Sequence, residues 1–242
     1  ASALGAVHRG DRDVPASGNP ATLRQKKDLL QKRLENGDKK IRELILEENK
    51  SAKRNNEGPQ PIARWTFDKD LKDQIGNIHG KALGGARIND GALELDGKSA
   101  YVMTIPINRN MKAKTLEAWV KLNNLDQRGG AVMSMQSNDA KTFDAIVFGD
   151  REPKRWMAGS EGYSRTQSFG GEEENRAKDE FTHVAIVYKA DGHITAYRNG
   201  KPYGKTYKSG SVDFSSGNYQ VLFGMRHGTK AGSNLMLSGK ID

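Results

Sequence analysis

The sequence has no cysteine, no long apolar segment and, in its first sixty residues, no aromatic side chain. The absence of cysteine excludes disulfide bonds, thiolate metal sites and cysteine nucleophiles. No apolar run approaches the roughly 20 residues that a membrane-spanning helix needs. All 7 Phe, 7 Tyr and 3 Trp residues follow residue 60, so the main packed core is expected after that point.

The chain is basic, with 39 Lys and Arg residues against 30 Asp and Glu residues and a net charge of +9. A nucleic-acid-binding surface would gather the positive side chains on one face or in one stretch. Here both signs are interspersed along the whole chain. The composition therefore predicts a solvated surface of mixed charge and no nucleic-acid partner.

Three segments are expected before the main domain. Residues 1–21 are rich in Gly, Pro, Ser and Asp, which predicts a linker. Residues 51–61 are polar and end in proline, which predicts a second linker. Residues 22–50 between them predict a helical segment, because apolar residues recur at the a and d positions of a heptad. Those residues are Leu23, Leu30, Leu34, Ile41 and Leu44.

Two arrangements of this helical segment remain open. Lys27 and Glu48 occupy two positions of the heptad, and Gly37 interrupts its middle, where glycine costs about 1 kcal/mol relative to alanine. The segment is therefore either one strand of a weak coiled coil or a short hairpin of two helices. Its apolar stripe requires a partner, which we expect to be another domain of the same protein.

Residues 62–242 predict a mainly β domain, a two-sheet antiparallel jelly-roll sandwich. Short segments rich in β-branched and aromatic residues alternate with Gly, Asp and Asn turns. Asp96-Gly97, Asp191-Gly192 and Asn199-Gly200 are typical hairpin turns. The expected strands are 62–67, 92–95, 100–105, 115–122, 131–136, 143–148, 155–158, 182–189, 193–199 and 220–225.

Several of these segments resemble the laminin-G-like, concanavalin A-like lectin/glucanase jelly rolls. The resemblance lies in Ile62-Ala-Arg-Trp-Thr-Phe-Asp68, Gly91-Ala-Leu-Glu-Leu-Asp-Gly97, Thr115-Leu-Glu-Ala-Trp-Val-Lys121, Thr182-His-Val-Ala-Ile-Val-Tyr188 and Leu237-Ser-Gly-Lys-Ile-Asp242. The first of these is similar to the family's opening strand. The last is similar to the start of its closing strand, which is expected to be cut short at Asp242. The tryptophan of the third segment, Trp119, and Trp65 are expected in the core.

A narrower resemblance is to the jelly-roll module of large exported planctomycete proteins that also carry a cytochrome-c-like domain. It lies in Leu125-Asp-Gln-Arg-Gly-Gly-Ala-Val-Met133, Phe143-Asp-Ala-Ile-Val-Phe-Gly149 and Val221-Leu-Phe-Gly-Met-Arg-His227. This resemblance implies a multidomain protein located outside the cytoplasm. Without cysteine, no haem can be attached covalently to this chain.

The laminin-G-like resemblance also implies a calcium ion held by loop carboxylates. Asp126, Asp144 and Asp150 are the candidate ligands, and Asp139 lies in the same loop-rich stretch. The alternative is that these aspartates accept hydrogen bonds from their own turns. No complete EF-hand loop and no closely spaced histidine pair occurs in the sequence.

A polar and aromatic stretch provides the candidate carbohydrate site. Aromatic rings stack on the C–H faces of sugars, and Arg, Glu and Gln bind hydroxyl groups. Arginine also binds carboxylate or sulfate in a bidentate manner, which would suit an acidic or sulfated glycan. The candidate residues are Trp156, Glu161, Tyr163, Arg165, Gln167, Arg226 and His227. The alternative is that Trp156 belongs to the core and Arg165 pairs with a neighbouring glutamate.

These observations favour a non-catalytic carbohydrate-binding module within a larger exported protein. A structural or protein-interaction module that docks neighbouring domains is the alternative. A glycoside hydrolase comes third, because retaining catalysis needs two carboxylates about 5 Å apart on one face. The run Glu172-Glu173-Glu174 is contiguous and follows two glycines, which indicates a loop.

Overall fold

The computed structural model describes residues 20–51, 60–232 and 235–242. The chain divides between Gln60 and Pro61 into two compact units, and each is described by itself. Most of the predicted linker 1–21 and most of the predicted linker 51–61 lie outside the described residues.

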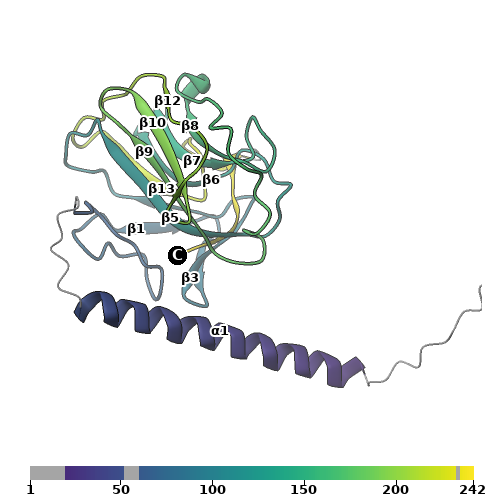
Figure 1. Ribbon diagram of the computed structural model, residues 1–242. Helices are drawn as coiled ribbons and strands as arrows, with labels where there is room; N and C mark the ends of the chain where they lie inside the picture. The colour runs from purple at the N-terminus through teal and green to yellow at the C-terminus, as the bar shows by residue number, and fades with distance from the viewer. Residues whose placement is uncertain (1–19, 52–59, 233–234) are drawn as a thin grey trace, which may run out of the picture. The chain divides into compact units, whose positions relative to one another are not determined.

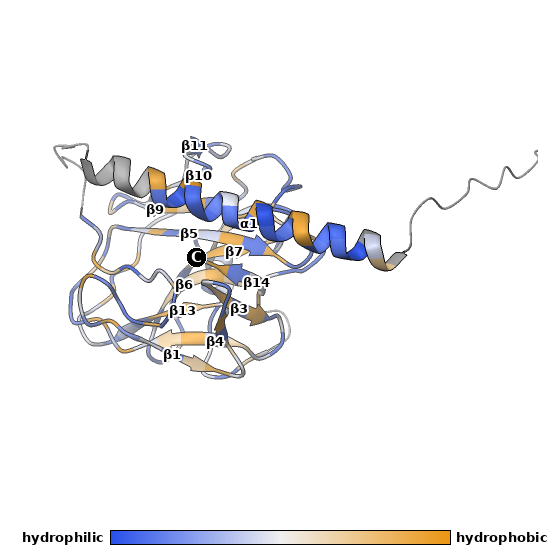
Figure 2. Cartoon of the chain, turned by 90° about the horizontal axis from the view of Figure 1, so that it is seen from below, coloured by the Kyte–Doolittle hydropathy of each residue, from blue (hydrophilic) through white to orange (hydrophobic). Residues whose placement is uncertain are grey.

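The first unit contains one helix, α1 (Pro20–Ser51). Proline suits the first turn of a helix because its fixed φ is helical and its missing N–H has no partner there. The helix continues through Gly37, so the hairpin alternative is wrong. Leu30, Leu34 and Ile41 are exposed, and Figure 2 shows apolar and polar residues alternating along α1. No helix of the described residues is long and apolar enough to span a membrane.

The second unit contains two antiparallel β-sheets, whose strands form separate layers (Figure 1). The six-stranded sheet has the order β1 (Gly80–Leu83), β4 (Tyr101–Thr104), β13 (Tyr219–Phe223), β6 (Ala131–Ser137), β7 (Phe143–Phe148) and β8 (Trp156–Ser160). The eight-stranded sheet has the order β11 (Lys201–Pro202), β10 (His193–Arg198), β9 (Thr182–Tyr188), β5 (Lys114–Leu122), β14 (Ser238–Ile241), β3 (Ala92–Asp96) and β2 (Arg87–Asn89), and β12 (Tyr207–Lys208) pairs with β10. This architecture confirms the predicted mainly β, two-sheet sandwich.

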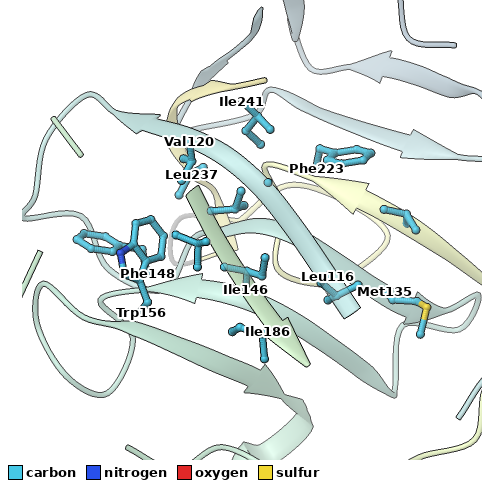
Figure 3. Close-up of a cluster of buried hydrophobic side chains, with 14 of the residues drawn as sticks. Leu116, Val120, Met135, Ile146, Phe148, Trp156, Ile186, Phe223, Leu237 and Ile241 are labelled. Atoms are coloured by element: carbon cyan, nitrogen blue, oxygen red, sulfur yellow. The ribbon is translucent and has the colours of Figure 1, made fainter. Parts of the chain in front are cut away.

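The core lies between the sheets, and β5 shows how the sequence builds it. Side chains of a strand alternate between its two faces. Leu116, Val120 and the other apolar residues of one phase of β5 are buried, whereas in the other phase Thr115, Glu117 and Trp119 are exposed and Lys121 is half-buried. Ile146 and Phe148 of β7 belong to the same buried cluster (Figure 3).

The outer face of the six-stranded sheet, which is turned away from this core, is also covered. Every residue of β7 and β8 is buried. Phe143, Ala145 and Val147 form a second apolar cluster. Leu222 of β13 packs with Met225 and Met236, which form an isolated bridge beyond the strand. The chain that follows β13 thus covers part of this sheet.

The predicted opening strand 62–67 is wrong, because these residues form no strand. The carboxylate of Asp73 instead accepts the backbone N–H of Arg64 at 2.9 Å and that of Ile75 at 3.0 Å. The Trp65 indole donates to the carbonyl of Ile78 at 2.9 Å. A side chain therefore orders this segment in place of a strand ladder.

Candidate functional site

Trp156 is a core residue and cannot offer a face to a sugar. It is 1 % exposed and lies on β8 opposite Phe148, with ring centroids 4.8 Å apart (Figure 3). Its indole N–H donates to Glu174 Oε2 at 2.9 Å. The predicted role of Trp156 as an exposed platform is wrong, because its side chain belongs to the core between the two sheets.

Glu174 itself is a structural residue. Its buried carboxylate also accepts the backbone N–H groups of Arg176 and Ala177 and pairs with Arg198 Nε at 2.8 Å. The run Glu172-Glu173-Glu174 thus lies in a loop, as predicted, and the carboxylate of Glu174 is buried.

Arg165 is buried and fully engaged by protein groups. Its Nε donates to Asp144 Oδ1 at 3.0 Å, and its two terminal nitrogens donate to the Glu161 carboxylate at 2.7 and 2.8 Å. The alternative of an Arg165 pair with a nearby glutamate is thus the one observed. Arg165 has a positioning role and does not face solvent as a glycan donor.

Asp144 lies between two buried cations. Lys114 Nζ is 2.6 Å from its Oδ2, and Arg165 lies on its other oxygen. Burial lowers the pKa of Lys114, and the neighbouring Asp144 carboxylate offsets part of that effect. This triad of Lys114, Asp144 and Arg165 joins β5 to β7 inside the sandwich.

The predicted calcium ligands do not fit a calcium site. Asp144 is neutralised by two cations, Asp150 pairs with Arg226, and Asp126 is exposed in a loop. Among the described residues, no three His, Asp or Glu side chains are grouped so that they could hold a metal ion. Asp139 accepts the N–H of Lys141 within its own turn, as the alternative expected.

Tyr163, Asp150 and Arg226 do come together at the surface. Tyr163 is 45 % exposed, and its hydroxyl lies 3.4 Å from Asp150 Oδ1. Arg226 binds the other oxygen of Asp150 at 2.8 Å. The Arg151 guanidinium lies 5.1 Å from the centre of the Tyr163 ring. An aromatic face, a carboxylate and two cations thus form one surface cluster.

The backbone at Tyr163 is strained. Tyr163 ends the short helix η1 (Glu161–Tyr163) with a φ of 60°, in the left-handed region that favours glycine. Such a conformation costs on the order of 1–3 kcal/mol and is concentrated at functional sites in proteins. The surrounding structure therefore has to offset this local cost.

His227 and Glu161 border the cluster. The His227 ring stacks on Phe143, with centroids 4.4 Å apart and planes 5° apart. Burial and the nearby Arg226 lower the pKa of His227, which favours a neutral ring at pH 7. The Nδ1 of His227 and the Nε of Arg226 are buried and have no hydrogen-bond partner in the protein. Gln167, the last predicted residue, is exposed.

Sequence reasoning misplaced one aromatic residue. Trp119, expected in the core, is 47 % exposed on the outer face of the eight-stranded sheet. The signal was present, because Trp119 shares its strand phase with Glu117 and Lys121. Trp119 and Tyr163 are the exposed aromatic residues among those that the structure describes.

Three comparisons place this fold among known proteins. The fourth domain of an extracellular family 43 arabinanase from Geobacillus stearothermophilus, solved with arabinotriose, has 19 % identity, a TM-score of 0.55 and coverage of 74 % of this chain and 88 % of that chain. The binding domain of Paraclostridial mosquitocidal protein 1 has 14 % identity, a TM-score of 0.48 and coverage of 74 % and 46 %. A family 66 carbohydrate-binding module from Bacillus subtilis has 10 % identity, a TM-score of 0.40 and coverage of 67 % and 87 %.

At 19 % identity the likeness to the arabinanase domain shows the fold alone, and the other two likenesses, with TM-scores under 0.5, carry no further argument. No curated protein matches the chain. The family model of the concanavalin A-like lectin/glucanase superfamily (laminin G type 3) matches residues 96–242, which is more than half of the sequence. That stretch contains β5 to β14 and the surface cluster around Tyr163. The chain therefore belongs to the concanavalin A-like lectin/glucanase superfamily.

Proposed function

We propose that the β-sandwich is a non-catalytic carbohydrate-binding module of a larger exported protein. The observation that carries the proposal is the cluster of Tyr163, Asp150 and Arg226, in which an exposed ring is held beside hydrogen-bonding groups of both charges. Ligand sites combine an apolar surface with a few precisely oriented polar groups, and this cluster has that composition.

Each residue of the cluster has a chemical role in this proposal. The Tyr163 ring stacks on the C–H face of a sugar, and Asp150 accepts hydroxyl protons. Arg226 holds the Asp150 carboxylate beside the ring through its terminal nitrogen. Arg151 and Arg226 add positive charge beside the ring, which favours a uronate or sulfated sugar over a neutral one.

The carboxylates of the two sheets support a non-catalytic role. Asp144 is the one carboxylate on the six-stranded sheet, and it is buried between cations. A general acid needs a raised pKa. Side-chain hydrogen bonds, from Asn89 and His183 respectively, lower the pKa values of Glu94 and Glu117 on the other sheet. Burial acts to raise the pKa of Glu161, but the hydrogen bonds from Arg165 and from backbone N–H groups, together with the charge of Arg165, lower that pKa overall.

A second function, as a docking module for neighbouring domains, is favoured by α1. Leu29, Leu30, Leu34, Ile41 and Leu44 are large apolar residues exposed on one helix. In water such a helix gains most of its stability from packing its apolar stripe. In this alternative, α1 contacts another domain of the same protein and no glycan is bound.

The experiment is a glycan-array screen of the full chain with neutral, uronate and sulfated sugars. We expect binding to acidic sugars, reduced about tenfold or more in Tyr163→Ala and in Arg226→Gln, since a lost contact of roughly 1.4 kcal/mol lowers affinity tenfold. Tyr163→Phe keeps the ring and should retain most binding. Thr115→Ala, at an exposed position on the eight-stranded sheet, is the matched control. Absence of binding from a folded chain would favour the docking function.

A further inference from the structure

We propose that the outer face of the eight-stranded sheet carries a second carbohydrate-binding platform, centred on Trp119 and separate from the Tyr163 cluster. Its ligand is a neutral polysaccharide chain whose flat sugar rings present C–H faces. This site lies on a different sheet from the first, because β5 belongs to the eight-stranded sheet and Tyr163 follows β8 of the six-stranded sheet.

The orientation of Trp119 is fixed by its neighbours. The rings of Trp119 and His183 lie 5.2 Å apart, and these residues are directly paired between β5 and β9. His183 Nε2 lies 3.0 Å from Glu117 Oε1, so two contacts link Trp119, His183 and Glu117. The His183 side chain is only 15 % exposed and packs against the indole from the neighbouring strand, while 47 % of Trp119 remains accessible. Preorganisation of this kind lowers the entropic cost of binding.

Backbone hydrogen bonds hold both strands on either side of this arrangement. The N–H of His183 donates to the Asn199 side-chain oxygen at 3.0 Å. The N–H of Trp119 donates to the carbonyl of Asp242 at 3.1 Å, and the Asp242 N–H returns a bond at 2.9 Å. The platform therefore lies on a rigid sheet, where a binding geometry is better defined than on a loop.

The surroundings of Trp119 favour a polysaccharide over a protein partner. The residues in the same phase of β5 are Thr115, Glu117 and Lys121, and Lys240 pairs with Lys121 from β14. The centre of a protein interface is depleted in charged residues, whereas here the ring stands among them. An isolated ring bordered by hydrogen-bonding groups fits a sugar, which needs one apolar face and several partners for hydroxyl groups.

Glu117 is the residue best placed to bind those hydroxyl groups. Its side chain is 61 % exposed, and it is held by His183 through one carboxylate oxygen. The other oxygen is not part of that contact and can accept a hydroxyl proton at the edge of a stacked ring. Lys121, two residues beyond Trp119, can donate on the opposite side along the strand.

The test uses the full chain with insoluble cellulose and chitin in pull-down assays and with soluble xylan in affinity electrophoresis. We expect binding to at least one of them, with a loss of about tenfold or more in Trp119→Ala and a smaller loss in Trp119→Phe. Tyr163→Ala should leave this binding unchanged. Thr115→Ala, on the same strand face, is the matched control and should bind as the parent chain does.

A second readout follows the indole itself. Addition of xylan, or of soluble cello-oligosaccharides, should protect a fluorescence component from acrylamide quenching, and this component should be missing in Trp119→Phe. Absence of binding to all these polysaccharides, or equal binding by the parent and Trp119→Ala, would overturn the proposal. If all sugar binding is lost in Tyr163→Ala and kept in Trp119→Ala, the proposed function stands and the second platform does not.

Discussion

In the six-stranded sheet, β7 and β8 are buried on both faces, whereas β5 of the eight-stranded sheet buries one face and exposes the other. The same residue type therefore has different roles in the two places. Trp156 on β8 packs against Phe148 and is closed off from solvent, while Trp119 on β5 is open. The difference teaches that the phase of a residue along its strand decides its role, because Trp156 faces the core between the sheets with Phe148 whereas Trp119 lies in the outward phase of β5.

The largest loss of folding stability should come from replacing Asp144, a buried residue of β7. Replacement by alanine leaves Lys114 and Arg165 without their shared counter-charge in the core. Loss of one partner of a buried ion pair costs about 3–5 kcal/mol. We expect chemical denaturation to show this loss for Asp144→Ala, and a change within about 0.5 kcal/mol for Asp126→Ala at an exposed position. Equal effects of the two variants would remove the distinction between buried and exposed carboxylates.

The next largest difference in folding stability should be the one between Trp156→Ala and Trp119→Ala. Trp156→Ala opens a cavity and leaves the buried Glu174 carboxylate without one of its donors, at a cost of about 3–5 kcal/mol. Trp119→Ala should cost less than about 1 kcal/mol, since surface substitutions are usually mild. Urea titration of both variants measures the difference. Similar destabilisation by both would mean that Trp119 is also a structural residue.

The carboxylate of Asp96, at the end of β3 in the eight-stranded sheet, should stabilise the fold slightly and in a way that depends on pH. Burial acts to raise its pKa, but hydrogen bonds from the N–H groups of Ala100, Ser99 and Lys98 outweigh it and lower the pKa from 3.8 to about 2. Because the folded pKa lies below the unfolded value, this stabilisation is present above pH 3.8 and is lost as pH falls through about 2. For an exposed group we expect less than about 1 kcal/mol.

The measurement for Asp96 is the melting temperature between pH 5 and pH 2, compared with Asp96→Asn. The stability difference between the two chains should shrink as the pH falls. A difference that stays constant down to pH 2 would mean that the charge of Asp96 contributes nothing to these hydrogen bonds.

Removal of metal ions should have the smallest effect. Of the predicted calcium ligands, Asp144 and Asp150 form ion pairs with Lys114 and Arg226, and Asp126 is exposed in a loop. If no ion binds the folded state, none of its binding free energy is lost on chelation. We therefore expect EDTA to leave both the melting temperature and glycan binding unchanged. A clear drop in either one would restore calcium as a ligand.

Much of the fold could be predicted because its signals are local. The segment 143–148 coincides with β7, and the hairpin turn at Asn199-Gly200 has φ values of 49° and 74°, as the predicted turn type requires. β1 and β2 were missed because these edge strands are short and carry exposed Lys81 and Arg87. Residues 62–67 have the pattern of a strand but are held by Asp73.

The candidate site was harder to predict because it depends on contacts between distant segments. Tyr163 and Arg226 are 63 positions apart in the numbering and meet through Asp150, which no local pattern reveals. Arg165 looked available from its polar neighbours, yet it is buried against Asp144 of another strand. The exposure of Trp119 could have been predicted from the sequence, because Glu117 and Lys121 share its strand phase and are charged.

The position of β14 has a consequence for the order of folding. β14 consists of residues 238–241 and lies between β5 and β3 in the eight-stranded sheet, paired with both. The two halves of that sheet are thus joined by a segment synthesised more than a hundred residues after β5. On the ribosome, β3 and β5 wait for β14 with their edges unpaired, and such edges are prone to aggregate. Completion of this sheet therefore waits until β14 has been synthesised.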